Sequence, residues 1–366
     1  MIYLTRCDTA YTETTTLVDD IRYPQHAHII PETFRRAKSG MAYPPHKLLE
    51  SVVTKETREY VQNNKTSGKT AFIFAAGNQG WMGNNGRYDK NPDAELHYKI
   101  KVPFIVLTNI YAGRIASMFG PVDHVSTDAS ACASSLKVLM DVYNLVTNYG
   151  FTRVIVLSGE DAVNNLSLEF FGEAGASIQR DDNIVPSSFD DVNKGFYLGQ
   201  GAVLSVFETE PHESPRAKFL GAYSASEDNT NPLGQREDGA GYSKAIEGAL
   251  WVAKTPGNSV YMVKTHGTGT SVNNAAEKTA LTRTLNEFIA TSYKPRIGHT
   301  MGASGLLETD LMLRDINKGI IPKIPNRTSA DSVFVSEDTA PRGGMFLSLA
   351  AGMGNIYSAA LFSSEV

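Results

Sequence analysis

Residues 125–139 read Val-Ser-Thr-Asp-Ala-Ser-Ala-Cys-Ala-Ser-Ser-Leu-Lys-Val-Leu, and Cys132 lies at the centre of this stretch. A short apolar run leads into small residues, and apolar residues at helical spacing follow, which predicts a strand, a tight turn and a helix. The thiol then lies at a helix N-terminus, where the partial positive charge favours thiolate and free N–H groups can bind an oxyanion. The pattern indicates a nucleophile for acyl carbonyl groups; the competing interpretation is a buried structural cysteine.

Two histidines in glycine-rich segments favour the nucleophile over the structural cysteine. His266 lies in Lys-Thr-His-Gly-Thr-Gly-Thr (264–270), after the apolar segment 259–263, so we expect it at a strand end before a tight loop. His299 lies in Lys-Pro-Arg-Ile-Gly-His-Thr-Met-Gly-Ala-Ser-Gly (294–305), which predicts a turn entering a helix. A lone histidine is more often structural than catalytic, but two at element ends, together with a candidate nucleophile, indicate a shared site.

Several ordered segments resemble the β-ketoacyl synthases, the condensing enzymes of fatty-acid and polyketide synthesis, from about the sixties to the end of the chain. The matching segments are 128–135, 188–190, 195–202, 266–270 with Glu277, 294–300 with Glu308, and Gly-Met-Gly-Asn at 352–355. Alternating strands and helices by themselves imply an α/β fold with mixed sheets. The resemblance implies a thiolase-like fold, with two duplicated halves and mixed sheets in α-β-α-β-α layers. The expected halves are 1–210, with the nucleophile, and 211–366, with both histidines.

The resemblance implies a two-stage reaction at a Cys-His-His site. Cys132 accepts an acyl chain from an acyl-carrier protein or coenzyme A thioester. A malonyl thioester then loses carbon dioxide, and its carbanion attacks the acyl group to give a β-ketoacyl thioester two carbons longer. Thioester exchange suits a soft thiolate, and two neutral imidazole N–H groups can stabilise the enolate oxygen.

Further site residues follow from the same resemblance. Lys294 helps to keep the imidazoles neutral if it lies near His299, because a like charge disfavours imidazolium. The backbone N–H groups of Cys132 and Met353 are expected to hold the oxyanion formed at the thioester. The expected substrate-binding residues are Thr268, Thr270, Gly352 and Gly354. The reaction requires no metal and no organic cofactor.

Several charged residues have structural interpretations. Glu277 and Glu308 are expected to anchor the histidine loops, and Glu160 to cap a strand end or hold a loop. The basic cluster Arg35, Arg36 and Lys38 could form part of a docking patch for an acidic carrier protein, although an ordinary solvated face is the favoured interpretation.

The composition fits an enzyme with a large core. The chain has 366 residues, of which 42% are hydrophobic, and a formal net charge of -5, which gives no basic footprint for nucleic acid. Its two cysteines, Cys7 and Cys132, are unlike a disulfide framework or a zinc site. The N-terminus lacks a signal pattern, and no apolar run approaches the ~18 residues of a membrane span. With a working thiol, these features predict a cytoplasmic protein.

The rest of the chain alternates predicted strands and helices. We expect strands at 1–6, 69–76, 153–158, 202–208 and 219–223, and a hairpin at 344–363. We expect helices at 46–63, 103–118, 241–254 and 274–289. Residues 20–44 are predicted to be irregular because Pro24, Pro31 and Pro44 interrupt them and Pro45 follows directly.

Two departures from the family pattern affect the predicted site. Asn274 stands where an aspartate usually precedes Glu277, and we expect this to alter a hydrogen-bond network and not the chemistry. Met353 and Ala351 stand where bulky phenylalanines are usual. Because methionine is flexible, we hypothesise a looser gate over the acyl site and an unsaturated or aryl chain; simple repacking is the alternative.

These departures favour a specialised enzyme, and discrete condensing enzymes of aryl-polyene and type II polyketide pathways are the nearest class. The expected partners are an acyl-carrier protein and a second ketosynthase-like subunit, in a homodimer or in a heterodimer with a chain-length factor. Two other functions stay open: a non-catalytic chain-length-factor-like subunit, and a Cys-dependent acyltransferase without condensation. The retained Cys132, His266 and His299 argue against both.

Overall fold

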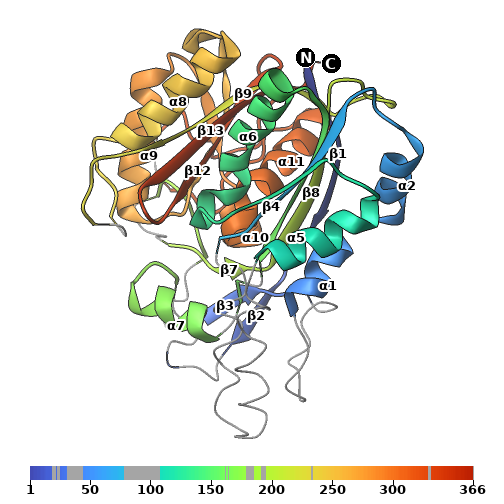
Figure 1. The fold of residues 1–366 in the computed structure, drawn as a ribbon. Helices are drawn as coiled ribbons and strands as arrows, with labels where there is room; N and C mark the ends of the chain where they lie inside the picture. The colour runs from blue at the N-terminus through green and yellow to red at the C-terminus, as the bar shows by residue number, and fades with distance from the viewer. Residues whose placement is uncertain are drawn as a thin grey trace, which may run out of the picture.

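A computed structural model of the chain gives the fold in Figure 1. It describes residues 1–18, 22, 25–30, 44–77, 108–160, 162–163, 165–178, 185–190, 195–231, 234–328 and 331–365. The basic cluster Arg35, Arg36 and Lys38 lies outside these ranges, as do residues 103–107 of one predicted helix, so both predictions remain untested there. Within the described ranges, the helices are too short or too polar to cross a membrane.

Ten strands form one mixed sheet in the order β11-β10-β12-β13-β9-β1-β8-β6-β4-β5. One side comprises β1 (Ile2–Ala10), β4 (Lys69–Ala75), β5 (His124–Asp128), β6 (Phe151–Glu160) and β8 (Gly201–Glu208). The other comprises β9 (Ala217–Ser226), β10 (Met262–Lys264), β11 (Ile289–Thr291), β12 (Met345–Gly352) and β13 (Ile356–Ser363). The two sides meet where residues 2–4 of β1 pair antiparallel with residues 217–219 of β9.

The two sets of strands have the same topology. In each set the third strand in chain order lies at the edge, followed by the second, fourth, fifth and first. In each set the second strand is parallel to both of its neighbours, and the remaining pairs are antiparallel. This repeat confirms the predicted fold of two duplicated halves.

Helices form the other layers (Figure 1). α6 (Ser134–Tyr149) and α11 (Ser304–Asn317) lie between the two halves of the sheet, where α6 contacts β6 and β9 and α11 contacts β8 and β12. One outer layer comprises α8 (Ala240–Ala253) and α9 (Ser271–Thr284). The other comprises α1 (Pro44–Ser51), α2 (Lys55–Asn63) and α5 (Thr108–Ala116). The α-β-α-β-α order is therefore as predicted.

The central strands are apolar because helices cover both faces of the sheet. Every residue of β8 is buried, and in β6 only the second residue is partly exposed. Strands buried on both faces are near-continuous hydrophobic runs without polar alternation. One hydrophobic cluster packs Leu48, Leu49 and Val52 of the outer layer against Phe72 and Phe74 of β4. A larger cluster fills the space around the central helices.

Two predicted helices differ from the structure. The range 46–63 contains two helices, because Thr54 caps the second: the Thr57 N–H donates to Thr54 Oγ1 at 3.2 Å. The helix predicted at 274–289 lies earlier in the chain, since α9 begins at Ser271 and ends at Thr284. The strand β11 begins at Ile289, where the predicted helix ends. With three residues, it is too short to show the alternating hydrophobic pattern of a strand.

A second sheet supports the second histidine. It comprises β2 (Thr15–Val18), β3 (Gln25–His28) and β7 (Leu198–Gly199), so the prediction of irregular backbone at 20–44 is wrong for β3. β3 runs parallel to β7. The Gly199 N–H donates to the His299 carbonyl at 3.0 Å, and the His299 N–H donates to Tyr197 O at 2.7 Å. The glycine-rich segment 195–202 therefore fixes the backbone of His299.

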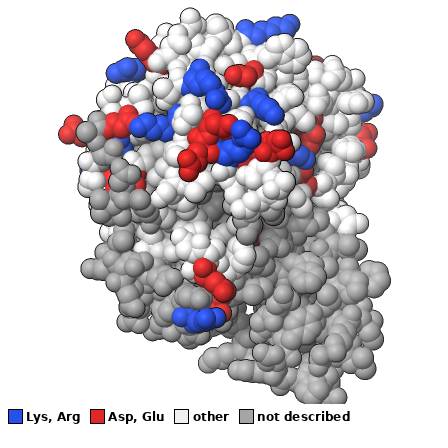
Figure 2. All heavy atoms as spheres, turned by 90° about the vertical axis from the view of Figure 1, so that its left-hand side faces the viewer, with Lys and Arg blue, Asp and Glu red and all other residues white. Residues whose placement is uncertain are grey.

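The outer face formed by α8 and α9 carries mixed charge. Figure 2 shows Lys, Arg, Asp and Glu side chains interspersed over this face. Described ion pairs of α9 and of the loop before α8 include Lys278–Asp331 at 2.5 Å and Arg236–Asp238 at 2.6 Å. Because the two signs alternate, the described part of this face forms no extended field of one sign for an acidic partner.

Candidate active site

Cys132 lies in the turn that links β5 to α6, as predicted. The one-turn helix η3 (Ala131–Ala133) leads directly into α6, and Ala131 has a positive φ of 47°. Ser134 holds the turn: its Oγ accepts the Ser130 N–H at 2.8 Å and donates to Ala131 O at 2.7 Å. The cysteine itself is buried. The turn thus presents a thiol at the start of a sixteen-residue helix.

The surroundings of Cys132 oppose the thiolate that its position at a helix N-terminus favours. Burial, followed by the negative charge of Glu160, raises the pKa of Cys132 to about 12. The positive charge of Lys294 and the cysteine's own backbone N–H act in the opposite direction but are outweighed. The nucleophile must therefore lose its proton during the reaction.

A carboxylate on the adjacent helix clamps the loop of His266. The His266 N–H donates to Glu277 Oε1 at 2.5 Å, and the Gly267 N–H donates to Glu277 Oε2 at 3.0 Å. Asn273 Nδ2 also donates to Glu277 Oε2, at 3.2 Å, while Asn274 Nδ2 reaches Gly269 O at 3.4 Å. Glu277 is the structural anchor that the sequence predicts.

The predicted substrate-binding threonines lie in the same tightly packed loop. Gly267 and Gly269 have positive φ values of 56° and 75°. A Cβ on Gly269 would lie 2.6 Å from two backbone oxygens, so this position requires glycine. The Oγ1 atoms of Thr268 and Thr270 are 3.0 Å apart, and Thr268 is buried.

The hydrogen bonds of His299 define its tautomer. The Met301 N–H donates to His299 Nδ1 at 3.3 Å, and Ser304 Oγ lies 3.0 Å from the same nitrogen. A backbone N–H can only donate, so Nδ1 is the acceptor and the proton of the neutral ring lies on Nε2. His299 can therefore offer an Nε2–H group.

The two imidazoles lie close together and are neutral. Their ring centroids are 5.7 Å apart, with the planes at 82°. Burial, then the charge of Lys294, lowers the pKa of both His266 and His299 well below the usual value; Lys264 contributes in each case. The charge of Lys294 thus acts in the direction that its predicted role requires. His266 Nδ1 is buried and, within the described part of the chain, lacks a hydrogen-bond partner.

Apolar side chains connect the thiol to the histidines. Cys132 Sγ lies 4.0 Å from Met301 Sδ, and the ring of Phe196 meets that of His299 edge-on at 5.1 Å. Cys132, Met301 and Phe196 belong to one buried cluster with Val163 and Leu168, among others. An acyl chain bound to the thiol would find an apolar environment here. Sequence reasoning missed Met301 and Phe196 because they look like ordinary core residues.

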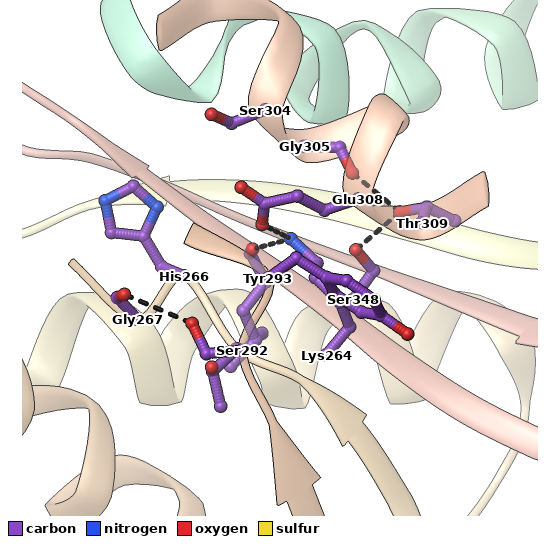
Figure 3. A network of polar contacts seen from close by, with 12 residues as sticks. Lys264, His266, Gly267, Ser292, Tyr293, Ser304, Gly305, Glu308, Thr309 and Ser348 are labelled. Carbon is purple, nitrogen blue, oxygen red and sulfur yellow. Dashed lines mark hydrogen bonds and ion pairs between the residues drawn. The ribbon is translucent and has the colours of Figure 1, made fainter. Parts of the chain in front are cut away.

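Lys294 belongs to a buried ion network that also includes a lysine to which we assigned no role. Lys294, in α10 (Lys294–Ile297), donates to Glu308 Oε1 at 2.8 Å. Lys264 Nζ donates to Glu308 Oε2 at 3.2 Å and to Leu349 O at 2.6 Å. Figure 3 shows Lys264 and Glu308 of this network from close by, with His266 alongside. The only sequence signal for Lys264 is a lysine at the end of an apolar strand.

The turn of His299 repeats the geometry of the nucleophile turn. The one-turn helix η6 (Met301–Ala303) precedes α11, as η3 precedes α6, and Met301 has a positive φ of 50°. Gly302 thus stands where the other half has Cys132. Glu160 lies between the loops: its Oε2 accepts N–H groups of Gly302 at 3.2 Å and Gly77 at 3.1 Å. Glu160 is thereby a loop anchor, as expected.

The predicted gate residues lie in the turn between β12 and β13. A Cβ on Gly352 would lie 2.5 Å from Ser130 O, so this glycine permits close contact with the nucleophile turn. Met353 is 37% exposed, and Gly354 has a positive φ of 87° with open space around it. Asn355 Nδ2 ties the turn to Asn229 O at 2.6 Å.

The chain is similar to known families and to individual proteins. Residues 46–212 match the family model described as Beta-ketoacyl synthase, N-terminal domain, and residues 216–328 match the C-terminal domain of the same family. The 3-oxoacyl-[acyl-carrier-protein] synthase 2 of Vibrio harveyi is 30% identical over 240 residues, covering 61% of this chain and 57% of the relative. The matches span somewhat over half the length of the curated relatives.

Solved structures share the fold at low sequence identity. One is a type II polyketide synthase acyl-carrier protein in complex with its ketosynthase bound to the hexaketide. Its similarity has a TM-score of 0.78 at 15% identity, covering 99% of this chain and 98% of that one. Another is a ketosynthase in complex with its chain length factor from Xenorhabdus doucetiae. That similarity has a TM-score of 0.75 at 15% identity, covering 99% and 97%.

Proposed function

Because the chain belongs to the β-ketoacyl synthase family, we propose that it is a β-ketoacyl-[acyl-carrier-protein] synthase with Cys132 as its nucleophile. The observation that carries the proposal is one buried site with a thiol at a helix start and two neutral imidazoles. The thiol comes from the first set of strands and helices, and the imidazoles from the second. The domain boundary between residues 210 and 211 belongs to the same proposal.

The first stage transfers an acyl group to Cys132. The sulfur attacks the carbonyl carbon of an acyl-carrier thioester, the carbon–sulfur bond to the carrier breaks, and the carrier thiolate takes up the proton that Cys132 loses. A neutral imidazole can relay that proton. The backbone N–H groups of Cys132 and Met353 stabilise the oxyanion. The action of the Cys132 N–H on the charge of its own sulfur supports this part of the proposal.

The second stage condenses the acyl group with a malonyl unit. The malonyl thioester releases carbon dioxide, and His266 and His299 donate N–H groups to the enolate oxygen. The enolate carbon attacks the Cys132 thioester, the carbon–sulfur bond breaks, and the cysteine thiolate that leaves takes up a proton from solvent. Thr268, Thr270, Gly352 and Gly354 line the path of the carrier-bound substrate in this proposal.

The partners follow from the relatives. A solved ketosynthase binds an acyl-carrier protein and another binds a chain length factor, which supports a carrier protein and a second ketosynthase-like subunit as partners here. The second subunit is identical or related. A thiol that must stay reduced supports a cytoplasmic location.

Intact-mass measurement tests the proposal. The purified chain is incubated with acyl-carrier thioesters of different chains, beside Cys132→Ala, and malonyl carrier is then added. We expect a mass gain on the wild type alone, followed by loss of the acyl group as a β-ketoacyl carrier. Acylation without condensation would indicate an acyltransferase, and no acylation by any donor would indicate a chain-length-factor-like subunit.

A further inference from the structure

Lys264 is a charged residue in the core at the end of β10. Its side chain is fully buried, and β10 lies between β11 and β12. Removing an ammonium group from water is costly unless ion pairs and hydrogen bonds replace the hydration. A methionine of similar size would pack in the same space without this cost. The presence of a lysine here therefore points to a role for its charge or its donors.

The contacts of Lys264 join its own strand, β10, to β12 and α11. Its Nζ donates to Leu349 O of β12 at 2.6 Å and to Glu308 Oε2 of α11 at 3.2 Å. The other oxygen of Glu308 binds Lys294 at 2.8 Å. One carboxylate therefore serves two lysines, so the network has a surplus positive charge when both are protonated.

Each lysine lies just before one of the two histidines in the sequence, and Glu308 binds both lysines. Lys264 precedes His266 by two residues on the same strand end, and Lys294 precedes His299 by five. Figure 3 shows Lys264 and Glu308 joined beside the strand end that carries Ser292 and Tyr293. A displacement of Glu308 would therefore disturb the Lys294 contact as well.

We propose that Lys264 is a positioning residue of the condensing site, which fixes Glu308 for Lys294 and supplies a second positive charge that keeps His266 and His299 neutral. This inference rests on the proposed function only for its activity readout. The charges that lower the pKa values of both histidines are those of Lys294 of α10 and Lys264 of β10. Glu277 of α9 accepts the His266 N–H, and Glu308 of α11 binds both lysines. Glu160 of β6 accepts the Gly302 N–H in the turn after His299, and its charge acts on Cys132 of η3.

The effect of Lys264 is selective within the site. The charges that shift the pKa of Cys132 are those of Glu160 and Lys294, whereas Lys264 lowers the pKa of both histidines. Removing the charge of Lys264 should therefore alter decarboxylation, which needs both imidazoles neutral, more than acylation of the thiol, for which one neutral imidazole is enough to relay the proton. A purely structural lysine would not separate the two steps in this way.

The test measures malonyl-carrier decarboxylation for the wild type, Lys264→Gln and Lys264→Met, from the lowest pH at which each protein stays folded up to pH 9. As the pH falls, both folded variants should lose activity at a pH roughly one unit higher than the wild type, because imidazolium forms more readily without the Lys264 charge. Acylation of Cys132 at neutral pH should change by less than about threefold. Lys318→Met, at the exposed end of α11, is the matched lysine control and should keep the wild-type pH dependence.

A second readout does not depend on the reaction. Histidine ¹⁵N NMR follows protonation of the rings, and the imidazolium signals of Lys264→Gln should appear about one pH unit above those of the wild type. Wild-type pH dependence in either folded variant, by both readouts, would overturn the proposal. If Lys264→Gln does not fold, Lys264→Met decides by the same criterion. A wild type that decarboxylates no malonyl carrier would refute the proposed function, while the NMR result would still decide the role of Lys264.

Discussion

At the scale of single residues, burial dominates the chemistry of Cys132. Because its pKa is raised to about 12, the thiolate fraction should grow about tenfold per pH unit across the working range. We therefore expect the rate of alkylation by iodoacetamide to rise about tenfold from pH 7 to 8 and again from pH 8 to 9. Intact mass over time measures this rate, and Cys132→Ser corrects for reaction at Cys7.

Removing the charge of Glu160 tests the cause of the raised Cys132 pKa. Its negative charge raises the pKa of Cys132, so Glu160→Gln should alkylate faster than the wild type at each pH. A plateau in the wild-type rate below pH 9 would show that the thiol is far more acidic than its surroundings imply. Such a plateau would mean that Cys132 is a thiolate at working pH, as its position at a helix N-terminus favours.

Lys264 gives a second residue-scale prediction, for stability. Burial lowers its folded pKa to about 8, against about 10.4 for an unfolded lysine. Between these values the unfolded chain binds more protons at this group, so its contribution to the free energy of unfolding rises with pH. Below pH 8 the group is protonated in both states and the penalty of burial is fully present.

Urea unfolding at pH 8, 9 and 10 measures this contribution. The stability of the wild type relative to Lys264→Met should increase over the series, because only the wild type carries the group. Lys318→Met, which removes a largely exposed lysine, should show a smaller dependence. A difference that stays constant or falls between pH 8 and 10 would mean that the buried ammonium is better compensated than its contacts indicate.

At the scale of elements, the His266 loop depends on glycines in a crowded left-handed backbone. Gly267 has φ 56°, and a Cβ there would lie 2.2 Å from Ser292 Oγ. Gly319 has φ 76° but nothing within 4 Å of its Cβ position. We expect Gly267→Ala to lower the free energy of unfolding by about 2–4 kcal/mol and Gly319→Ala by only about 1 kcal/mol.

Chemical denaturation of the two variants isolates the effect of crowding, because the backbone penalty is common to both. Equal losses would show that Ser292 moves away without cost. That outcome would also remove the argument that this loop is held rigidly beside Glu277.

The residues of the site show what can and cannot be predicted from the sequence. Cys132, His266 and His299 lie in distinctive small-residue motifs, so their element ends could be predicted. Lys264 could not be assigned a role, because its partners Glu308 and Leu349 are distant in sequence. The strand β11 and the small-sheet strand β3 are too short for a hydrophobic period and depend on pairing with remote segments.

At the scale of the whole molecule, the site depends on the contact between the two central helices. α6 begins just after Cys132, and α11 begins shortly after His299. They meet closely at Gly305: a Cβ there would lie 2.8 Å from Leu136 Cβ and 3.1 Å from Ser135 Oγ. The Leu306 N–H donates to the same Ser135 Oγ at 3.1 Å. The spacing of the helices therefore determines the spacing of thiol and imidazole.

Gly305→Ala should force the helices apart and change the relation between the two halves of the site. We expect a loss of about 1–3 kcal/mol in the free energy of unfolding and a fall of about tenfold or more in condensation. Gly113→Ala, in α5 with open space around it, is the matched helical control. It should be neutral or stabilise by up to about 1 kcal/mol, since alanine favours helices. If Gly305→Ala is destabilised yet condenses at the wild-type rate, the helix contact maintains the fold without setting the geometry of the site.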